Sequence, residues 1–333
     1  MIMTFKAIKT LHIPRYLLAA LGLLCSMWSM ATEYPLTLEH KFGTSVIPEQ
    51  PTRVATVDWG GGDNLLALGY QPLTVRYWFG DNEKGVWPWA QPYLNSTPEV
   101  IRGELNYEQI AKTNPDVIIA IRSGISKEDY QQLSKIAPVV AAPKGVGMYM
   151  LTWEERAQIV AKVVNKEQEA ADLIASIKTK IQNVKQGHPD WPNKTLAMAT
   201  YWNGSVGVYS HEDVTVRLKT ELGLQVDPSI QALSEKGSFY TTISEEQLPL
   251  LDADVLFWYT GEGAKEKIES LVLRPHLRAY KEGREIFLST SSNLNGAISY
   301  GSLLSLPVAI DTLVPLIEQA IDGDPNTPVM ATP

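Results

Sequence analysis

The sequence predicts an α/β protein with two similar lobes on either side of one long helix. Residues 152–187 form the longest helical pattern, with apolar side chains at three- and four-residue steps, the period of a helix with one buried face. Before it, residues 108–118 read EQIAKTNPDVI; after it, residues 246–256 read EQLPLLDADVL. Each copy predicts a helical turn, a loop and a buried strand. The alternative is chance, because this succession recurs in many α/β proteins.

The long helical pattern has its own start and break signals. Thr152 and Glu155 have the spacing of a capping box. We expect a kink at Val164–Asn165, which would leave residues 166–186 as a helix of roughly 30 Å.

Composition excludes several classes of protein. The chain has 333 residues and a formal net charge of −8, and it lacks the basic runs that favour nucleic-acid binding. Its single cysteine, Cys25, excludes an intrachain disulfide.

Residues 1–31 have the pattern of a cleaved secretory signal peptide. A basic start is followed by an apolar run over residues 16–30 and by Ser29-Met30-Ala31, a small-x-small cleavage site. Lipidation at Cys25 is the alternative, less favoured because Leu24 stands where a small residue is expected. We therefore expect an exported protein beginning near Thr32.

The first elements after the signal peptide predict an open α/β sheet. Residues 34–51 read as a hairpin and 53–58 as a strand, followed by the turn Gly60–Gly62 and a helix capped by Asp63. The spacing of these glycines fits neither phosphate-binding motif, so no nucleotide site is expected.

The remaining elements alternate in the same way. We expect helices at 127–136 and 214–222, strands at 72–77, 138–142, 195–202, 206–210 and 285–290, and helical segments over 301–321 broken at Pro307 and Pro315. Residues 323–333 are polar and proline-rich, as in a loosely held tail.

Aromatic residues cluster after the second strand. Tyr77, Trp78 and Phe79 are followed by Trp87 and Trp89. Such a cluster forms either a small satellite core or one wall of a ligand site, and both interpretations stay open for Trp87 and Trp89.

Several longer segments together resemble one family. They are FGTSVIPEQPTRVATVD, LLALGYQPL, NYEQIAKTNPDVIIA, YQQLSKIAPVV, ISEEQLPLLDADVLF and YGSLLSLPVAID. In order and spacing they resemble the periplasmic substrate-binding proteins of iron–siderophore ABC importers, a class whose relatives also bind cobalamin, haem or metal ions. The resemblance covers nearly the whole mature chain.

The resemblance implies two doubly wound α/β lobes joined by a single long rigid helix. The expected division is a signal peptide at 1–31, an N-terminal lobe at 32–151, a linker helix region at 152–187 and a C-terminal lobe at 188–333. It also implies a periplasmic, monomeric protein that captures a ferric siderophore between the lobes. The partners would be an inner-membrane permease and its ATPase. The siderophore would hold the iron, so neither a cofactor nor a direct metal ligand is expected.

The resemblance also implies two docking residues. In the cobalamin-binding relative one glutamate per lobe pairs with arginines of the permease, and these positions correspond to Glu108 and Glu246. The alternative is an acidic residue in a helix first turn, favoured by the helix dipole alone.

For the ligand, the resemblance implicates Arg102, which lies in the run IRGELNYE at residues 101–108. Arg76 and Arg122 follow other predicted strands, and ligands of open α/β sheets bind at the carboxyl ends of strands. Because guanidinium groups pair with carboxylate and catecholate oxygens, three arginines favour an anionic chelate such as ferric citrate or a catecholate. The other candidates are Trp59, Tyr77, Trp78, Tyr201, Trp202, Tyr240, Trp258, Tyr259, Asn293 and Asn295.

Other functions are less consistent with the sequence. His40, His188, His211 and His276 show no metal-ligand spacing, which argues against a bare-metal binder. Residues 203–207 read NGSVG, which is not a nucleophile elbow, so a secreted enzyme is disfavoured. Haem and cobalamin remain open alternatives, because both suit aromatic clefts.

Overall fold

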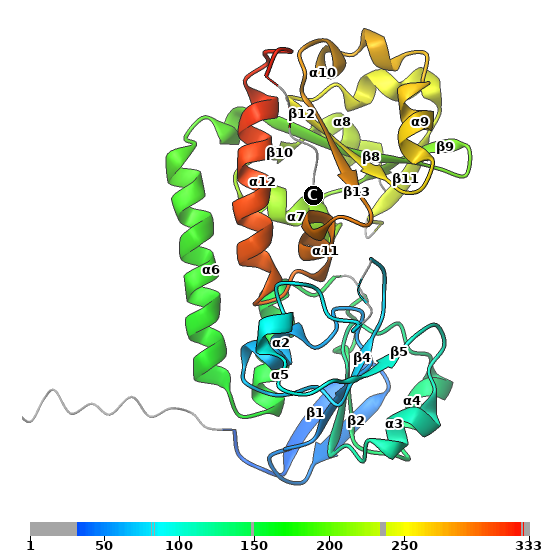
Figure 1. The fold of residues 1–333 in the computed structure, drawn as a ribbon, viewed down its shortest axis with the longest axis vertical. Coiled ribbons are helices and arrows are strands. Elements are labelled where there is room, and N and C mark those ends of the chain that lie inside the picture. Colours follow the sequence, from blue (N-terminus) through cyan, green and yellow to red (C-terminus); the bar gives the residue numbers. More distant parts are fainter. Residues whose placement is uncertain are drawn as a thin grey trace, which may run out of the picture. The chain divides into compact units, whose positions relative to one another are not determined.

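The computed structural model describes residues 32–80, 82, 84–147, 150–233, 238–327 and 329. The chain from Thr32 onward forms one compact unit (Figure 1). The expected signal peptide, with Cys25, lies outside the described residues. Within the described residues, no helix combines the length and apolar character needed to cross a membrane.

The N-terminal lobe contains a hairpin and short parallel sheets. In the hairpin, β1 pairs antiparallel with β2, as the sequence predicts. A parallel sheet has the order β3-β6-β7, and β4 pairs in parallel with β5. The strands are β1 Leu36–His40, β2 Gly43–Ile47, β3 Val54–Thr56, β4 Thr74–Arg76, β5 Glu99–Ile101, β6 Val117–Ala120 and β7 Val139–Ala141, and the helices are α2 Asp63–Ala67, η1 Gln91–Tyr93, α3 Tyr107–Lys112 and α4 Lys127–Leu133.

The C-terminal lobe contains a six-stranded mixed sheet of order β11-β9-β8-β12-β13, with β10 also paired to β8. Strands β8, β12 and β13 are parallel, and the antiparallel β9 and β11 extend one edge. The strands are β8 Thr195–Trp202, β9 Ser205–Tyr209, β10 Gln225–Val226, β11 Tyr240–Ile243, β12 Val255–Thr260 and β13 Glu285–Ser289. The helices are η2 Trp191–Asn193, α7 Val214–Glu221, α8 Pro228–Leu233, η3 Glu245–Leu251, α9 Ala264–Glu269, η4 Arg274–His276, α10 Arg278–Lys281, α11 Asn293–Tyr300 and α12 Ser305–Ile321.

Both faces of each central strand are buried, as in doubly wound sheets. In β12, Phe257 packs in the large core shared with α7, α11 and α12, whereas Leu256 and Trp258 pack in a second core with α8 and η3. In β6, Ile119 joins the large core and Ile118 faces α3 and α4. The two α/β lobes therefore share one core on the side of the long helices.

The long helical region breaks where the sequence predicts. The capping box of Thr152 and Glu155 starts α5 (Trp153–Val163), and α6 runs from Glu167 to Gly187. Between them Asn165 adopts a left-handed conformation with φ of 54°, which asparagine tolerates better than most residues. The single long helix expected between the lobes is therefore α6, and α5 is a separate helix.

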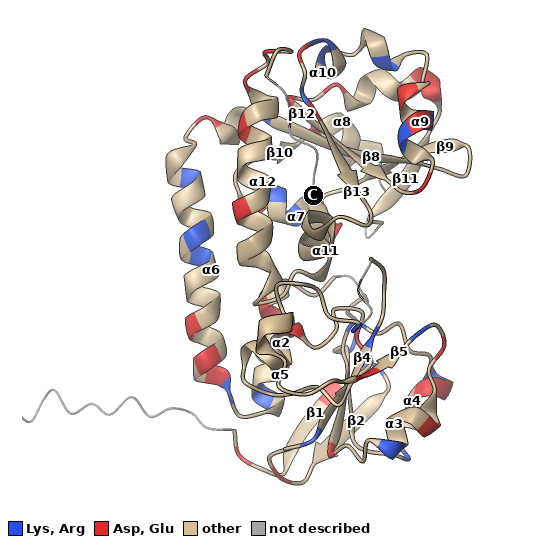
Figure 2. Cartoon of the chain, in the orientation of Figure 1, with Lys and Arg blue, Asp and Glu red and all other residues tan. Residues whose placement is uncertain are grey.

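Helix α6 packs its buried Ala170, Ile174 and Ile177 into the large core, and charged contacts also connect it to its neighbours. Lys178 pairs with Glu154 of α5 at 3.0 Å, and Lys180 pairs with Asp311 of α12 at 2.5 Å. Figure 1 shows α6 lying beside α12, and Figure 2 shows acidic residues at the start of α6 and basic residues toward its end, the distribution that complements a helix dipole.

Two local expectations were wrong. Helix α12 runs unbroken through both prolines, because Pro307 lies in the first turn, where its missing N–H needs no partner, while buried residues around Pro315 keep the rest of the helix packed. The cap of α2 is Gly62, not Asp63.

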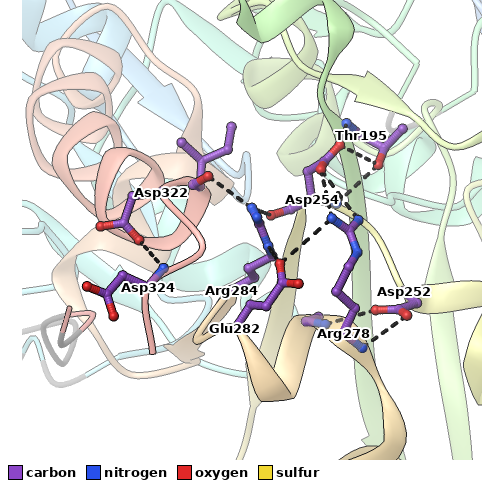
Figure 3. A network of polar contacts seen from close by, with 10 residues as sticks. Thr195, Asp252, Asp254, Arg278, Glu282, Arg284, Asp322 and Asp324 are labelled. Carbon is purple, nitrogen blue, oxygen red and sulfur yellow. Dashed lines mark hydrogen bonds and ion pairs between the residues drawn. The ribbon is translucent and has the colours of Figure 1, made fainter. Parts of the chain in front are cut away.

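The repeated aspartate has the same structural role in both lobes. Asp116 accepts hydrogen bonds from the backbone N of Thr52 and of Arg53, each at 2.9 Å. Asp254 accepts from the backbone N of Thr195 at 2.9 Å and also pairs with Arg278 (Figure 3). Each carboxylate thus fixes the start of the neighbouring strand, and the sequence repeat corresponds to a structural repeat.

We expect Asp254→Ala to lower the free energy of unfolding by about 1–3 kcal/mol and Asp116→Ala, at an exposed position, by about 0.5–1.5 kcal/mol, because each substitution removes the carboxylate that accepts from strand N–H groups. Urea unfolding measures this loss. Glu49→Gln, at an exposed position, is the control and should change stability by less than about 0.5 kcal/mol. Equal stability of the aspartate variants and the control would contradict the assigned role.

Candidate ligand-binding site

A cavity of about 1080 Å³ is lined by residues of both lobes. The N-terminal lobe contributes the loop after β4 and the segment after β6. The C-terminal lobe contributes the ends of β8, β9, β12 and β13, the start of β11, the starts of α7 and α9, and one face of α11. The lining residues are Trp78, Phe79, Arg122, Thr200, Tyr201, Trp202, Asn203, Tyr209, Asp213, Val214, Thr215, Phe239, Tyr240, Tyr259, Gly261, Glu262, Gly263, Ala264, Lys267, Thr290, Asn295 and Ser299.

Trp78 and Arg122 form the N-terminal wall. Trp78 stacks on Tyr300 with ring centroids 6.0 Å apart, and the Arg122 guanidinium lies 4.8 Å from the centroid of Trp78. Arg122 is buried, and its Nη1 donates to the carbonyl oxygen of Ser299 on α11 at 2.7 Å. The aromatic loop thus forms one wall of the cavity at Trp78 and Phe79, and their contact with a ligand stays a prediction.

Trp87 and Trp89 instead have the structural role that the sequence left open. They stack on each other at 5.2 Å, and a Cβ added at Gly296 would lie 2.7 Å from the Trp87 ring. Trp89 donates from Nε1 to Asp63 at 2.8 Å. This pair packs the loop against α11.

The other N-terminal candidates lie next to this wall but are not among the described lining residues. Arg76 stacks 3.6 Å from the centroid of Trp59 and donates to the carbonyl oxygens of Ser123 and Gly103. These contacts orient the guanidinium group toward the backbone of the N-terminal lobe. The exposed Arg102 lies 4.2 Å from the centroid of Tyr77. Ligand contact by Arg76, Arg102, Trp59 and Tyr77 stays a prediction.

The C-terminal wall is a cluster of tyrosines. Tyr209 contacts Tyr240 at 5.3 Å and Tyr259 at 5.6 Å, both edge to face. A Cβ at Gly207 would lie 2.0 Å from the Tyr240 hydroxyl oxygen, so only glycine there leaves room for this ring. Tyr201 and Trp202, at the end of β8, complete the wall, and Trp202 is 74% exposed. The structure therefore brings together four predicted residues, Tyr201, Trp202, Tyr240 and Tyr259.

The predicted Trp258 does not reach the cavity. It is fully buried, and its Nε1 donates to Glu285 at 2.7 Å. Successive residues of a strand point to opposite faces, so Tyr259 lines the cavity while Trp258 lies in the core; the sequence prediction for Trp258 is corrected on this ground. Of the two asparagines, Asn295 lines the cavity and the exposed Asn293 is absent from its lining.

The sequence-based prediction missed several lining residues. Tyr209 ends β9 and had the same signal as Tyr201, namely an aromatic residue at a strand end. Asp213 caps α7, which in the sequence indicates only a helix start. Lys267 lies on α9, where no local pattern distinguishes it from a surface lysine.

A buried charge cluster lies behind the N-terminal wall. Arg156 donates to the carbonyl oxygens of Tyr300 and Gly301 at 3.1 and 2.7 Å, and burial lowers its pKa to about 9. Burial raises the pKa of Asp58 and of Asp63 to about 6. Asp63 accepts from Ser302 at 2.7 Å as well as from Trp89. These groups connect α2 and α5 to the end of α11.

The two expected docking residues are exposed on short helices of different lobes. Glu108 lies in the first turn of α3, and Glu246 in the first turn of η3. Among the described residues, no group of three or more His, Cys, Asp and Glu side chains comes together as a metal site.

Comparison with known proteins identifies close similarities. Residues 54–290 match the family model described as periplasmic binding protein. The chain is 31% identical over 265 residues, covering 74% of this chain and 78% of the relative, to the "Probable siderophore-binding lipoprotein YfiY" of Bacillus subtilis.

Solved structures show the same fold. A periplasmic solute binding protein of Mycobacterium smegmatis is 32% identical, with a TM-score of 0.74, over 86% of this chain and 98% of that one. PiaA of Streptococcus pneumoniae in complex with ferrichrome is 28% identical, with a TM-score of 0.74, over 86% and 99%.

We expect the buried carboxylates to make the protein less stable as pH rises from about 4 to about 6. Their pKa values are raised in the folded state, so over this range the folded protein holds protons that the unfolded chain releases. In Asp63→Asn the amide oxygen still accepts from Trp89 and Ser302, but the group no longer titrates. Relative to wild type, this variant should gain on the order of 2 kcal/mol between pH 4 and pH 6.5 in urea unfolding. A constant difference across this range would contradict the assignment.

Proposed function

This chain belongs to the periplasmic binding protein family, and we propose that it captures an iron(III)–siderophore complex and delivers it to an ABC importer. The observation that carries the proposal is the aromatic-walled cavity of about 1080 Å³ between Trp78 and Tyr259. Its size is that of a site for a small organic ligand. Relatives named for siderophore and Fe(3+)-citrate binding support the ligand class.

The protein would act outside the cytoplasm, with residues 1–31 as its export signal. Relatives described as lipoproteins make lipidation at Cys25 the alternative to signal cleavage near Ala31. Labelling with a radioactive or clickable fatty acid distinguishes them, since only the lipoprotein incorporates the label.

The chelate would lie against the aromatic rings, and the tyrosine and threonine hydroxyl groups would supply hydrogen bonds to its oxygens. Iron is cargo held by the siderophore, so the protein needs no metal ligands and no cofactor of its own. We assign the site to binding and release, not to catalysis.

The partner would be a membrane permease with its ATPase. Glu108 and Glu246 lie exposed on different lobes, and α6, tied to α5 and α12, would keep their separation nearly constant. Exposed ion pairs are individually weak, so docking would require both carboxylates together with complementary shape.

We expect a ferric siderophore to quench tryptophan fluorescence with saturation at one ligand per chain, because Trp78 and Trp202 line the cavity. At one hundred times its dissociation constant it should stabilise the protein by about 2.7 kcal/mol, visible as a rise in melting temperature. The iron-free siderophores are the matched controls. A panel that also includes haem and cobalamin tests the alternatives: stabilisation by either of these, without stabilisation by any ferric siderophore, would refute the proposed ligand.

We expect Glu108→Ala combined with Glu246→Ala to leave siderophore binding unchanged while lowering uptake in cells about tenfold or more, a loss of roughly 1.4 kcal/mol in docking. Glu128→Ala combined with Glu266→Ala, at exposed positions of α4 and α9, is the control. Normal transport by the first double variant would refute the docking assignment.

A further inference from the structure

The charged groups that line the cavity do not form a cationic site. Among the described lining residues, Arg122 and Lys267 are basic, and Asp213 and Glu262 are acidic. The positive charge of Arg122 is also partly balanced by Asp58, which lies behind the wall: the charge and the backbone N–H of Arg122 both stabilise the carboxylate of Asp58. The three arginines in the sequence suggested an anionic chelate, but only one of them lines the cavity.

Asp213 is the acidic residue held most firmly in this wall by its hydrogen bonds. It caps α7, and its Oδ1 accepts hydrogen bonds from the backbone N of Thr215 at 2.8 Å and from the Thr215 hydroxyl. Asp213 also helps to raise the pKa values of Tyr209 and Tyr259, after the larger effect of burial. Its field therefore reaches the tyrosine wall.

The basic residues of α7 offset this charge only in part. Lys219 is fully buried, donates to the carbonyl oxygen of Thr215 at 2.9 Å, and has a pKa lowered by burial to about 7. Burial therefore disfavours the charged form of Lys219. Arg217 pairs with Glu212 at 3.8 Å and donates to the backbone of Met150.

If the cavity binds ferric siderophores, as proposed above, its wall can also select among them. We propose that Asp213 is a specificity-determining residue that selects ferric chelates without net negative charge. Three hydroxamate groups, each with one negative charge, cancel the charge of iron(III) and give a neutral chelate. Three catecholate groups leave the chelate trianionic, and ferric citrate species are also anionic. A carboxylate fixed in a partly dehydrated wall repels such anions, and repulsion of the wrong ligand is an established route to specificity.

The test measures dissociation constants of wild type, Asp213→Asn and Asp213→Ser for ferrichrome as the neutral tris-hydroxamate, ferric enterobactin as the tris-catecholate, and ferric citrate. Asn and Ser are both good helix caps, so α7 keeps its start while the charge is lost. Asp227→Asn is the matched control, because Asp227 accepts from the backbone N of Ser229 at 2.8 Å before α8 but does not line the cavity.

We expect wild type to bind ferrichrome more tightly than either anionic chelate. Both Asp213 variants should bind ferric enterobactin about tenfold or more tightly than wild type does, with ferrichrome affinity changed less than about threefold and no change in the control. Tighter binding of an anionic chelate by wild type, or an unchanged ratio in both variants, would overturn the role of Asp213 while leaving siderophore binding intact. If wild type bound none of the three, both this inference and the proposed function would be overturned.

Discussion

The contact of Arg156 with the end of α11 is the interaction on which the cavity depends. From α5, the guanidinium donates to the last carbonyl oxygens of α11, at Tyr300 and Gly301. A buried arginine needs such acceptors, because an unpaired buried charge is strongly destabilising. Helix α11 follows the last strand of the C-terminal lobe, and its Asn295 and Ser299 line the cavity. This contact therefore holds part of one wall against the opposite lobe.

Other contacts act in the same direction. Arg122 reaches across to the carbonyl of Ser299, Asp63 accepts from Ser302, and the Trp87 ring packs against Gly296. Each joins a group of the N-terminal lobe to α11 or to the segment that follows it. With the single-helix connection, these contacts lead us to expect small adjustments of the cavity on ligand binding, which stays a prediction.

The sequence was most informative where a local pattern has one physical cause. The break at Asn165 and the capping box at Thr152 were predictable, because each depends on nearby backbone groups. The repeated aspartates were visible only as a sequence repeat, because their backbone partners lie 59–64 residues away in the chain. The aromatic residues at strand ends were also predictable, since parallel strands present their carboxyl ends to one edge of a sheet.

The composition of the cavity was less predictable, because it depends on tertiary contacts. Trp258 and Tyr259 are adjacent in sequence but lie on opposite faces of β12, and the register of a buried strand does not show which face meets the ligand. Arg76 could be recognised as a strand-end arginine, but its backbone partners at Ser123 and Gly103 come from other loops. The position of Asp213 in the cavity wall could not be predicted, because in the sequence an aspartate that caps a helix looks the same whether or not it also faces a cavity.

The most direct test of the account is a crystal structure of the protein grown with a ferric siderophore and measured at the iron absorption edge. Anomalous scattering locates iron without any assumption about the organic ligand. We expect one iron peak inside the cavity, between the rings of Trp78 and Tyr259, with siderophore oxygens and no protein side chains as its ligands. An iron peak outside this cavity, or one coordinated directly by protein carboxylates or histidines, would contradict it.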